Sequence, residues 1–408
     1  MSEAAHIPQL RFPEYSANWS QRLLSDFLIP TLREIEKPKV NYLAIGLRSH
    51  CKGTFQKPDS DPSKIAMEKL FRVKENDLIV NITFAWEGAI AIVKENDEGG
   101  LVSHRFPTYT FDTNITSHHF FKHQFINKRF RYLLDLISPG GAGRNRVMSK
   151  KEFVKLKVPL PSVGEQQKIA AFLTAVDNKI EQLSKKQALL GSWKKGLMQQ
   201  IFSQAIRFKA DDGSAFPVWE EKNIVELAKT SIGLVTSMTP YYVDKGVPLI
   251  RNNDIFQNKI RKEKLIRLDY EFDQLNKNRR LFTNDIVTVH TGNIGASAVI
   301  DEELNGCQGF ATLNTRIKNQ NEISSSFLCW YYNSTRNIKY ALSMATGDGR
   351  SNYNLKDFNK ATIPVPSLPE QTKIAAFLTA ADNKIEQVGK QLDESKQFKK
   401  ALLQQMFV

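Results

Sequence analysis

One stretch of fifteen residues occurs twice in this chain of 408 residues, and it constrains the fold more than any other feature. KIAAFLTAVDNKIEQ occupies 168–182 and KIAAFLTAADNKIEQ occupies 373–387, so the copies differ only at Val176 and Ala381. The same offset of 205 residues extends the alignment to both sides of this stretch. A repeat of this length predicts two similar structural units in one chain.

Each copy begins with the sequence signals of a helix N-terminus. Ser162 precedes Glu165 by three residues, and Ser367 precedes Glu370 by the same spacing. This is the capping-box pattern, in which hydroxyl and carboxylate each accept a hydrogen bond from a free backbone N–H. We therefore expect a long helix to begin just after each serine.

Apolar residues then recur at steps of four and three residues in both copies, with a few polar interruptions such as Lys194 and Lys399. An average step of about 3.5 residues is the signature of a coiled-coil seam, so each helix needs a partner helix. The other copy is the nearest candidate. The stripe consists of Ile169, Leu173, Val176, Ile180, Leu183, Leu190, Leu197 and Ile201, and then of Ile374, Leu378, Ala381, Ile385, Val388, Leu392, Leu402 and Met406.

The apolar face is wider in the first half of each helix than a two-helix seam requires. Phe172 and Phe377, each preceded by two alanines, supply this width. We interpret it as a docking surface for other chains, and packing against the chain's own domains is the alternative. The predicted docking residues are Ile169, Phe172, Leu173, Ile374, Phe377 and Leu378.

The segments that precede the two helices correspond more loosely. Each has Phe-Pro followed by a Trp, an apolar β-branched run that reads as a strand, and a glycine-rich basic turn before the helix. The rest differs in length and composition, which predicts two domains of similar frame and different surface. The expected boundaries are a globular domain at 1–159, a helical repeat at 160–208, a second globular domain at 209–364 and a C-terminal helical repeat at 365–408.

Composition narrows the class of partner. The formal net charge of +14 favours a polyanion such as nucleic acid. The three cysteines are far apart in the sequence and form no CxxC pair, which suits a reducing, cytoplasmic compartment. No apolar run approaches the roughly 18 residues of a membrane span, and no secretion signal is recognisable, so we expect no membrane association.

Motifs for chemistry are weak. The sequence has no N-P-P or D-P-P loop of an amino-methyltransferase and no phosphate-binding G-x-x-x-x-G-K-[ST] loop. His118, His119 and His123 lie close together, but no third-ligand pattern supports a metal site there, and histidines packed among aromatic residues are the simpler interpretation. We expect no catalytic residue, metal or cofactor on this chain.

Together these features resemble the specificity subunits of type I restriction-modification enzymes. The residues that carry the resemblance are PLPSVGEQQKIAAFL at 159–173 and PVPSLPEQTKIAAFL at 364–378, with the leading Phe-Pro segments and the G-x-G-R turns. The resemblance implies an α+β fold with two target recognition domains of mixed α/β structure. Each domain is followed by a long helix, and the two helices pack as an antiparallel coiled coil with pseudo-twofold symmetry.

The resemblance also implies a function in prokaryotic defence. Each target recognition domain would read one half of a bipartite, asymmetric site on double-stranded DNA, and the helices would set the spacer between the halves. Two modification (methyltransferase) subunits would dock on the helices, and restriction and translocase subunits would join where present. The chain itself would be non-catalytic, and S-adenosylmethionine, ATP and Mg would be bound by the partner subunits.

Base reading requires forked or bidentate polar side chains, and phosphate contacts require basic or small polar groups. Loops after predicted strands, and the two G-x-G-R turns, carry such residues. The candidates in the first half are Arg48, Ser49, His50, Lys52, Arg144, Asn145 and Arg146. Those in the second half are Arg251, Asn252, Asn253, Asp254, His290, Thr291, Asn293, Arg350, Ser351, Asn352 and Tyr353.

Two other classes of function remain as alternatives. One is a self-contained methyltransferase or nuclease fusion, which the missing motifs disfavour. The other is a coiled-coil scaffold that binds only proteins, which the positive charge and the two dissimilar domains disfavour.

Overall fold

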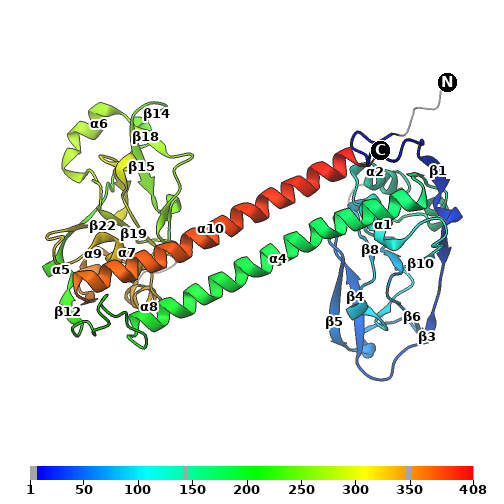
Figure 1. Cartoon of the computed structure of the whole chain (residues 1–408), viewed down its shortest axis with the longest axis horizontal. Helices are drawn as coiled ribbons and strands as arrows, with labels where there is room; N and C mark the ends of the chain where they lie inside the picture. Colours follow the sequence, from blue (N-terminus) through cyan, green and yellow to red (C-terminus); the bar gives the residue numbers. More distant parts are fainter. Residues whose placement is uncertain (1–6, 141–145, 346–350, 408) are drawn as a thin grey trace. The chain divides into compact units, whose positions relative to one another are not determined.

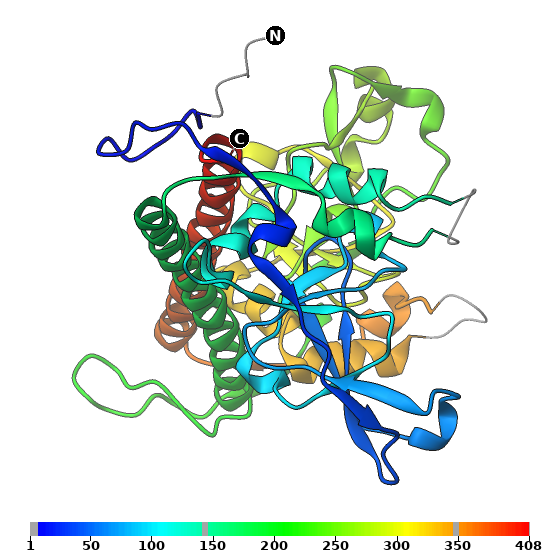
Figure 2. The same cartoon turned by 90° about the vertical axis from the view of Figure 1, so that its right-hand side faces the viewer.

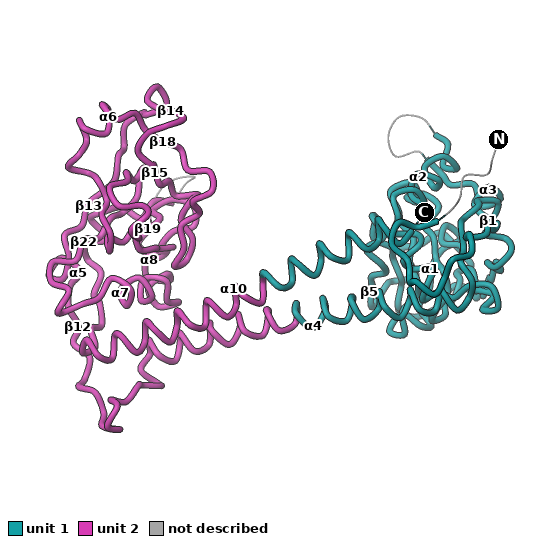
Figure 3. The backbone as a smooth tube through the Cα atoms, turned by 45° about the horizontal axis from the view of Figure 1, so that its top comes forward, with its two compact units in different colours: residues 1–184, 390–408 teal, residues 185–389 magenta. Residues whose placement is uncertain are grey.

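The computed structural model describes residues 7–140, 146–345 and 351–407. The chain divides into two compact units (Figure 3). Unit 1 comprises Met1–Ser184 and Lys390–Val408, and unit 2 comprises Lys185–Gly389. Each of the two long helices is therefore shared between the units, because α4 spans Val163–Phe202 and α10 spans Leu368–Gln405.

Unit 1 contains three sheets and short helices (Figure 1). The first pairs β1 (Ser20–Leu23) with β11 (Lys157–Leu160). The second has the order β2 (Leu28–Pro30), β10 (Thr108–Phe111), β7 (Leu78–Val80) and β8 (Ile90–Ile92). The third has the order β3 (Glu34–Glu36), β6 (Lys69–Arg72), β9 (Leu101–Val102), β4 (Tyr42–Leu47) and β5 (Thr54–Ser60). The short helices are α1 (His118–Gln124), α2 (Lys128–Leu136) and α3 (Lys150–Val154).

Unit 2 repeats this plan with different loops. β12 (Glu220–Asn223) pairs with β23 (Thr362–Val365), and β16 (Ile255–Phe256) pairs with β17 (Lys259–Ile260). One four-stranded sheet has the order β13 (Ala228–Ile232), β22 (Thr312–Ile317), β19 (Ile286–Val289) and β20 (Ser297–Val299). The other has the order β14 (Tyr242–Val243), β18 (Ile266–Leu268), β15 (Val247–Arg251) and β21 (Gln308–Phe310). The short helices are α5 (Ile224–Leu227), α6 (Tyr270–Leu275), α7 (Ser325–Tyr332), α8 (Thr335–Met344) and α9 (Leu355–Phe358).

The two units share a frame, as the repeat predicts. In unit 1 the strand before α4 pairs antiparallel with β1, and in unit 2 the strand before α10 pairs antiparallel with β12. The registers match as well, because Ser20 lies opposite Leu160 and Glu220 lies opposite Val365. Each unit also has a parallel strand pair, β4 with β9 and β15 with β21. The predicted α+β fold with two mixed domains and two long helices is confirmed.

Within each unit α4 and α10 run side by side (Figure 2). In unit 1 Asp177 pairs with Lys399, while Leu402 and Met406 share a core with Ile169 and Leu173, so the helix directions are opposed. In unit 2 Lys194 pairs in the same way with Asp382. Both N–O distances are 2.5 Å. The two lysines that interrupt the apolar stripes are therefore paired with aspartates of the facing helix.

The end of each long helix completes the core of a unit. Phe407, just beyond α10, packs its ring edge against Trp19 and also contacts Phe120 in unit 1. Phe202, the last residue of α4, packs against Phe327 and Tyr331 in unit 2. Each of these two phenylalanines is at most 5% exposed. Burial of this kind contributes about 2–3 kcal/mol per side chain.

The glutamates of the expected capping boxes have a different role in the structure. Ser162 does accept a hydrogen bond from the backbone N–H of Glu165. However, the Glu165 carboxylate accepts two hydrogen bonds from Arg11 at 2.7 Å and one from the indole N–H of Trp19. Glu370 is bound in the same way by Arg207 and Trp219, and the Ser367 hydroxyl has no partner among the described residues. The carboxylates tie each helix start to the segment containing the Phe-Pro motif instead of closing a cap.

Among the described residues, no helix combines the length and hydropathy needed to cross a membrane.

Glu370→Ala tests this arrangement. The Glu370 carboxylate is fully buried, and its removal leaves Arg207 Nε and the Trp219 N–H without their acceptor. We expect the free energy of unfolding of unit 2 to fall by about 3 kcal/mol, the lower end of the cost of breaking a buried pair, because Arg207 keeps partial access to solvent. Calorimetry of the full chain measures this change.

Asp211→Ala is the matched control. Asp211 pairs with Lys373 on the first turns of the same helix but is 96% exposed. Its loss should leave the unfolding temperature nearly unchanged. Equal effects of the two substitutions would contradict the structural role of the buried carboxylate.

Candidate nucleic-acid interface

Unit 2 contains a cleft of about 720 Å³ lined mainly by residues that the sequence marked as DNA contacts. Arg251, Asn252 and Asn253 come from the end of β15 and the turn that follows. The remaining lining residues are Thr291, Gly292, Ile294, Phe310 and Ser351. Three loops that are far apart in the sequence therefore meet at one surface, and they present amide, hydroxyl and guanidinium groups suited to DNA.

Hydrogen bonds join two of these loops. The Thr291 hydroxyl donates to Asn352 Oδ1 at 2.6 Å, and the backbone N–H of Tyr353 donates to the carbonyl of His290. Gly292, the residue after Thr291, has a φ of 90° and open space where a Cβ would lie. A DNA backbone can approach this turn closely.

Some predicted contacts of the second half have structural roles. Tyr353 is buried and packs edge-on against Phe358, and burial raises the pKa of its phenol. Asp254 is also buried, where it holds Arg251. His290 is half-buried, which lowers the pKa of its imidazole, whereas Asn293 is exposed. Arg350 lies outside the described residues.

In unit 1 the predicted residues form a turn after β4. Arg48 donates to the carbonyl of Thr54 and lies over the Phe55 ring at 5.2 Å. Glu87 accepts two hydrogen bonds from this turn. The Ser49 hydroxyl donates to its carboxylate, and the backbone N–H of His50 donates to its backbone carbonyl. His50 and Lys52 keep exposed side chains on this anchored turn.

The first G-x-G-R turn is described only at its end. Arg144 and Asn145 lie outside the described residues. Arg146 forms an ion pair with Asp135 at 2.7 Å, donates to the carbonyl of Ser138 and lies over the Trp86 ring at 5.1 Å. These contacts use the guanidinium within unit 1.

Sequence reasoning missed Ile294 and Phe310, which form the apolar part of the cleft in unit 2. In the sequence both resemble ordinary core residues, and no local signal distinguishes an apolar side chain that lines a cleft from one in the core.

Of the six predicted docking residues, four belong to the cores of their own units. Ile169 and Leu173 lie in the core of unit 1, and Ile374 and Leu378 lie in that of unit 2, each at most 2% exposed. The two phenylalanines differ from them. Phe377 is 38% exposed and contacts Trp193 and Phe208.

Phe172 in unit 1 packs edge-on against Phe12, with 5.9 Å between the ring centroids. Phe398, which the repeat offset places in the position of Trp193, is 53% exposed. Each unit therefore has partly exposed aromatic rings on its long helices.

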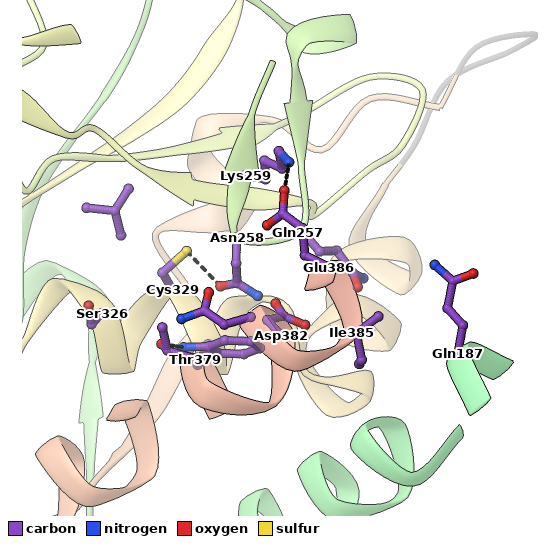
Figure 4. A pocket seen from close by; sticks show the side chains of 13 residues that line it. Gln187, Gln257, Asn258, Lys259, Ser326, Cys329, Thr379, Asp382, Ile385 and Glu386 are labelled. Carbon is purple, nitrogen blue, oxygen red and sulfur yellow. Dashed lines mark hydrogen bonds and ion pairs between the residues drawn. The ribbon is translucent and has the colours of Figure 1, made fainter. Parts of the chain in front are cut away.

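The surroundings of the repeated helices differ between the units. In unit 2 a cavity of about 520 Å³ lies between α10, α7 and the hairpin of β16 and β17 (Figure 4). Lys259 of the hairpin pairs with Glu386 at 2.8 Å, and Cys329 donates to Asn258. In unit 1 the corresponding groove, of about 390 Å³, is lined by α4, α1 and the cap residue Ser117. Identical helix faces therefore have different neighbours.

The three histidines of α1, His118, His119 and His123, do not share one environment. His118 and His119 are in ring contact, whereas His123 is buried, with neither ring nitrogen hydrogen-bonded to a described residue. Burial, with the charges of Lys122 and Lys399, lowers the pKa of His123 to about 3. No group of three or more His, Cys, Asp or Glu side chains in the described ranges is placed to hold a metal ion.

Comparison with known sequences identifies a family for these features. The family described as "Type I restriction modification DNA specificity domain" matches residues 28–190 and 218–395. The chain is 26% identical over 267 residues to the type I restriction enzyme MjaVIII specificity subunit of Methanocaldococcus jannaschii, covering 63% of this chain and 62% of that protein. It is 26% identical over 273 residues to the type I restriction enzyme EcoBI specificity subunit of Escherichia coli, covering 61% and 57%. The chain thus spans less than two thirds of the length of these relatives.

Two solved structures have a similar fold. The S subunit of a type I restriction-modification system from M. genitalium matches with a TM-score of 0.61 at 15% identity, covering 98% of this chain and 99% of that one. The HsdS subunit from Thermoanaerobacter tengcongensis matches with a TM-score of 0.51 at 15% identity, covering 97% and 98%.

His123→Leu tests the buried imidazole. Because the folded pKa is about 3 and the ordinary value is 6.5, the unfolded chain binds a proton in this window that the folded unit does not. Stability is therefore lost as the pH falls from about 6.5 towards 3. The leucine variant should lose this contribution, which reaches about 1.4 kcal/mol per pH unit.

Urea unfolding of the full chain at roughly pH 7, 5.5 and 4.5 measures this slope, and His104→Leu, at an exposed position, is the control. A pH dependence that is the same in wild type and His123→Leu would contradict the burial of a neutral histidine.

Proposed function

The chain belongs to the family of type I restriction modification DNA specificity domains, and on that premise we propose that it is the DNA-reading specificity subunit of a restriction-modification complex. Two family domains lie in one chain, so each unit would read one half of a bipartite, asymmetric DNA site. The proposed reading domains are 1–159 and 209–364.

The observation that carries this proposal is the cleft of unit 2. Three separate loops bring Arg251, Asn252 and Asn253 together with Thr291 and Ser351 at one open surface. Unit 1 has a different set of polar groups on the turn after β4, held by Glu87 and Phe55. Two similar frames with unlike loops are suited to reading two unlike half-sites. The net charge of +14 favours binding of the DNA backbone to both.

The helical segments 160–208 and 365–408 would set the spacer between the half-sites. The paired lysines and aspartates support this role, because a charged residue within an apolar seam specifies the register of two helices. A fixed register keeps each helix end in its core, and the helices would then set the spacer through their length.

Partner subunits would supply the chemistry. We propose that two modification subunits dock on the repeated helices and that restriction and translocase subunits join where present. S-adenosylmethionine, ATP and Mg would be bound by those partners, and this chain would be non-catalytic. The partly exposed rings of Phe172 and Phe377 are the proposed contacts, since the neighbouring apolar residues are used in the cores.

A map of methylated bases in host cells with and without the gene tests the function. We expect gene-dependent methylation at a motif of two short half-sites around a fixed, unspecified spacer. Where no mark appears, binding of the chain to duplex DNA is measured across salt concentrations. The logarithm of affinity should fall with the logarithm of salt by about 0.9 per neutralised phosphate. Absence of a mark together with salt-independent binding would contradict the proposal.

A charge at the aromatic positions tests docking. Phe172→Glu and Phe377→Glu should abolish assembly with co-expressed modification subunits, because a carboxylate cannot be buried there without a partner. Size-exclusion chromatography with light scattering measures the assembly, and circular dichroism shows that the domains remain folded. Leu275→Glu, at a position 85% exposed on α6, is the matched control and should assemble normally. Normal assembly of both phenylalanine variants would exclude these rings as the docking surface.

A further inference from the structure

Asp254 holds Arg251 in the lining of the cleft of unit 2. The Asp254 carboxylate accepts hydrogen bonds from its backbone N–H at 3.1 Å, from Nε at 3.1 Å and from Nη2 at 3.4 Å. The Asp254 side chain is 3% exposed, and Nη2 of a second arginine, Arg261, lies 3.6 Å from its Oδ1. The carboxylate is therefore a rigid, buried support, while the guanidinium stays 33% exposed in the cleft lining.

The contacts divide the guanidinium into two edges. Nε and one N–H of Nη2 form the side edge, and both face Asp254. The end edge consists of Nη1 and the second N–H of Nη2. Among the described residues, Asp254 is the one acceptor for this side chain, so the end edge keeps two parallel donors without a partner.

Two parallel N–H donors match guanine. In the major groove guanine presents N7 and O6 as neighbouring acceptors, and arginine binds both at once. Adenine presents a donor at the place of O6, so the same arginine loses one hydrogen bond and meets an unsatisfied N–H group. We propose that Arg251 reads a guanine in the half-site bound by unit 2, and that Asp254 is the positioning residue that directs the end edge of Arg251 to that base. This inference rests on the proposed DNA-reading function.

The cleft distinguishes Arg251 from other supported arginines. Arg280 binds Asp273 through the same side edge, but it lies outside the cleft lining. In unit 1, Arg48 follows the corresponding parallel-paired strand, but it donates Nη1 to a backbone carbonyl and lies over Phe55. The end edge of the Arg48 guanidinium therefore already donates one hydrogen bond within the protein. Only Arg251 combines a carboxylate on its side edge with a place in the cleft, among the arginines of the described ranges.

The support also lowers the cost of binding. A free arginine side chain loses rotamer freedom worth about 2 kcal/mol when it is immobilised on DNA. Two side-chain hydrogen bonds to Asp254 already hold the Arg251 guanidinium before DNA arrives. Asp254 keeps the guanidinium in one plane, which is the requirement for bidentate recognition of a base edge.

Selection from a library of randomised duplexes tests the proposal, with the full chain co-expressed with its partner subunits and sequencing of the bound DNA. The wild-type protein should select a bipartite site with an invariant G·C pair in one half. Arg251→Gln should reduce discrimination at that one base pair by roughly 5- to 150-fold, because one bidentate contact is lost. The other positions of that half, and the whole of the other half, should be selected as before.

Two further variants separate reading from folding and from charge. Arg251→Lys keeps the charge without the fork, so selection at the same pair should relax while the salt dependence of binding is retained. Asp254→Asn should relax the same pair without altering the unit 1 half-site. Arg336→Gln, the control, removes a guanidinium of unit 2 that is 56% exposed, pairs with Glu221 and lies outside the cleft lining, and it should leave the selected sequence unchanged.

The outcomes are distinguishable. A wild-type protein that selects no bipartite sequence would contradict the proposed function itself. A bipartite sequence that Arg251→Gln leaves unaltered, or one without a G·C pair at the altered position, would overturn only the role of Arg251. Retention of the other half-site in every variant shows that the protein is folded and bound, so a relaxed pair reports base reading.

Discussion

Each compact unit depends on a helix end that completes its core. Phe407 closes the aromatic core of unit 1 against Trp19, and Phe202 closes that of unit 2 against Phe327 and Tyr331. Because α4 begins in unit 1 and ends in unit 2, and α10 does the reverse, unit 1 is built from two separate segments, and unit 2 takes part of its core from both ends of the continuous segment Lys185–Gly389. The buried carboxylates at the two helix starts have the same effect, because each ties a helix to a segment more than 150 residues away in the sequence. Folding of the globular parts and pairing of the helices are thus coupled.

This coupling explains which parts of the fold were predictable. The repeat, the apolar stripe and the serine caps are local or periodic signals, and they located both helices and the two mixed domains. The partners of Glu165 and Glu370 were not predictable, because a serine followed by glutamate three residues later reads as a capping box. Only tertiary structure shows that Arg11 and Arg207 take these carboxylates instead. The lysines that interrupt the stripes were likewise visible as exceptions, but their aspartate partners lie on the other helix.

The candidate interface was predictable in its loops and not in the roles of individual residues. Strand-ending loops with Arg, Asn and Thr were identified from residue type, and the structure brings several of them into one cleft. Residue type cannot tell a polar group that faces the cleft from one that supports it. Tyr353 and Asp254 are predicted DNA contacts together with residues that do line the cleft, yet both are buried. The same limit applies to the helices, where Ile169 and Phe172 are three residues apart but only the phenylalanine remains partly exposed.

The division between frame and loops has a physical basis. Residues that close the units are buried, paired and matched between the two halves, so substitution there changes the stability of the whole chain. Arg48 follows β4 and Arg251 ends β15, and each of these strands belongs to the parallel strand pair of its unit. The groups that hold the two guanidiniums nevertheless differ. Arg48 rests on a ring and a backbone carbonyl, whereas Arg251 rests on a carboxylate. A change of support at such a position redirects a guanidinium without disturbing the strand beneath it. One frame can therefore present two different chemical surfaces.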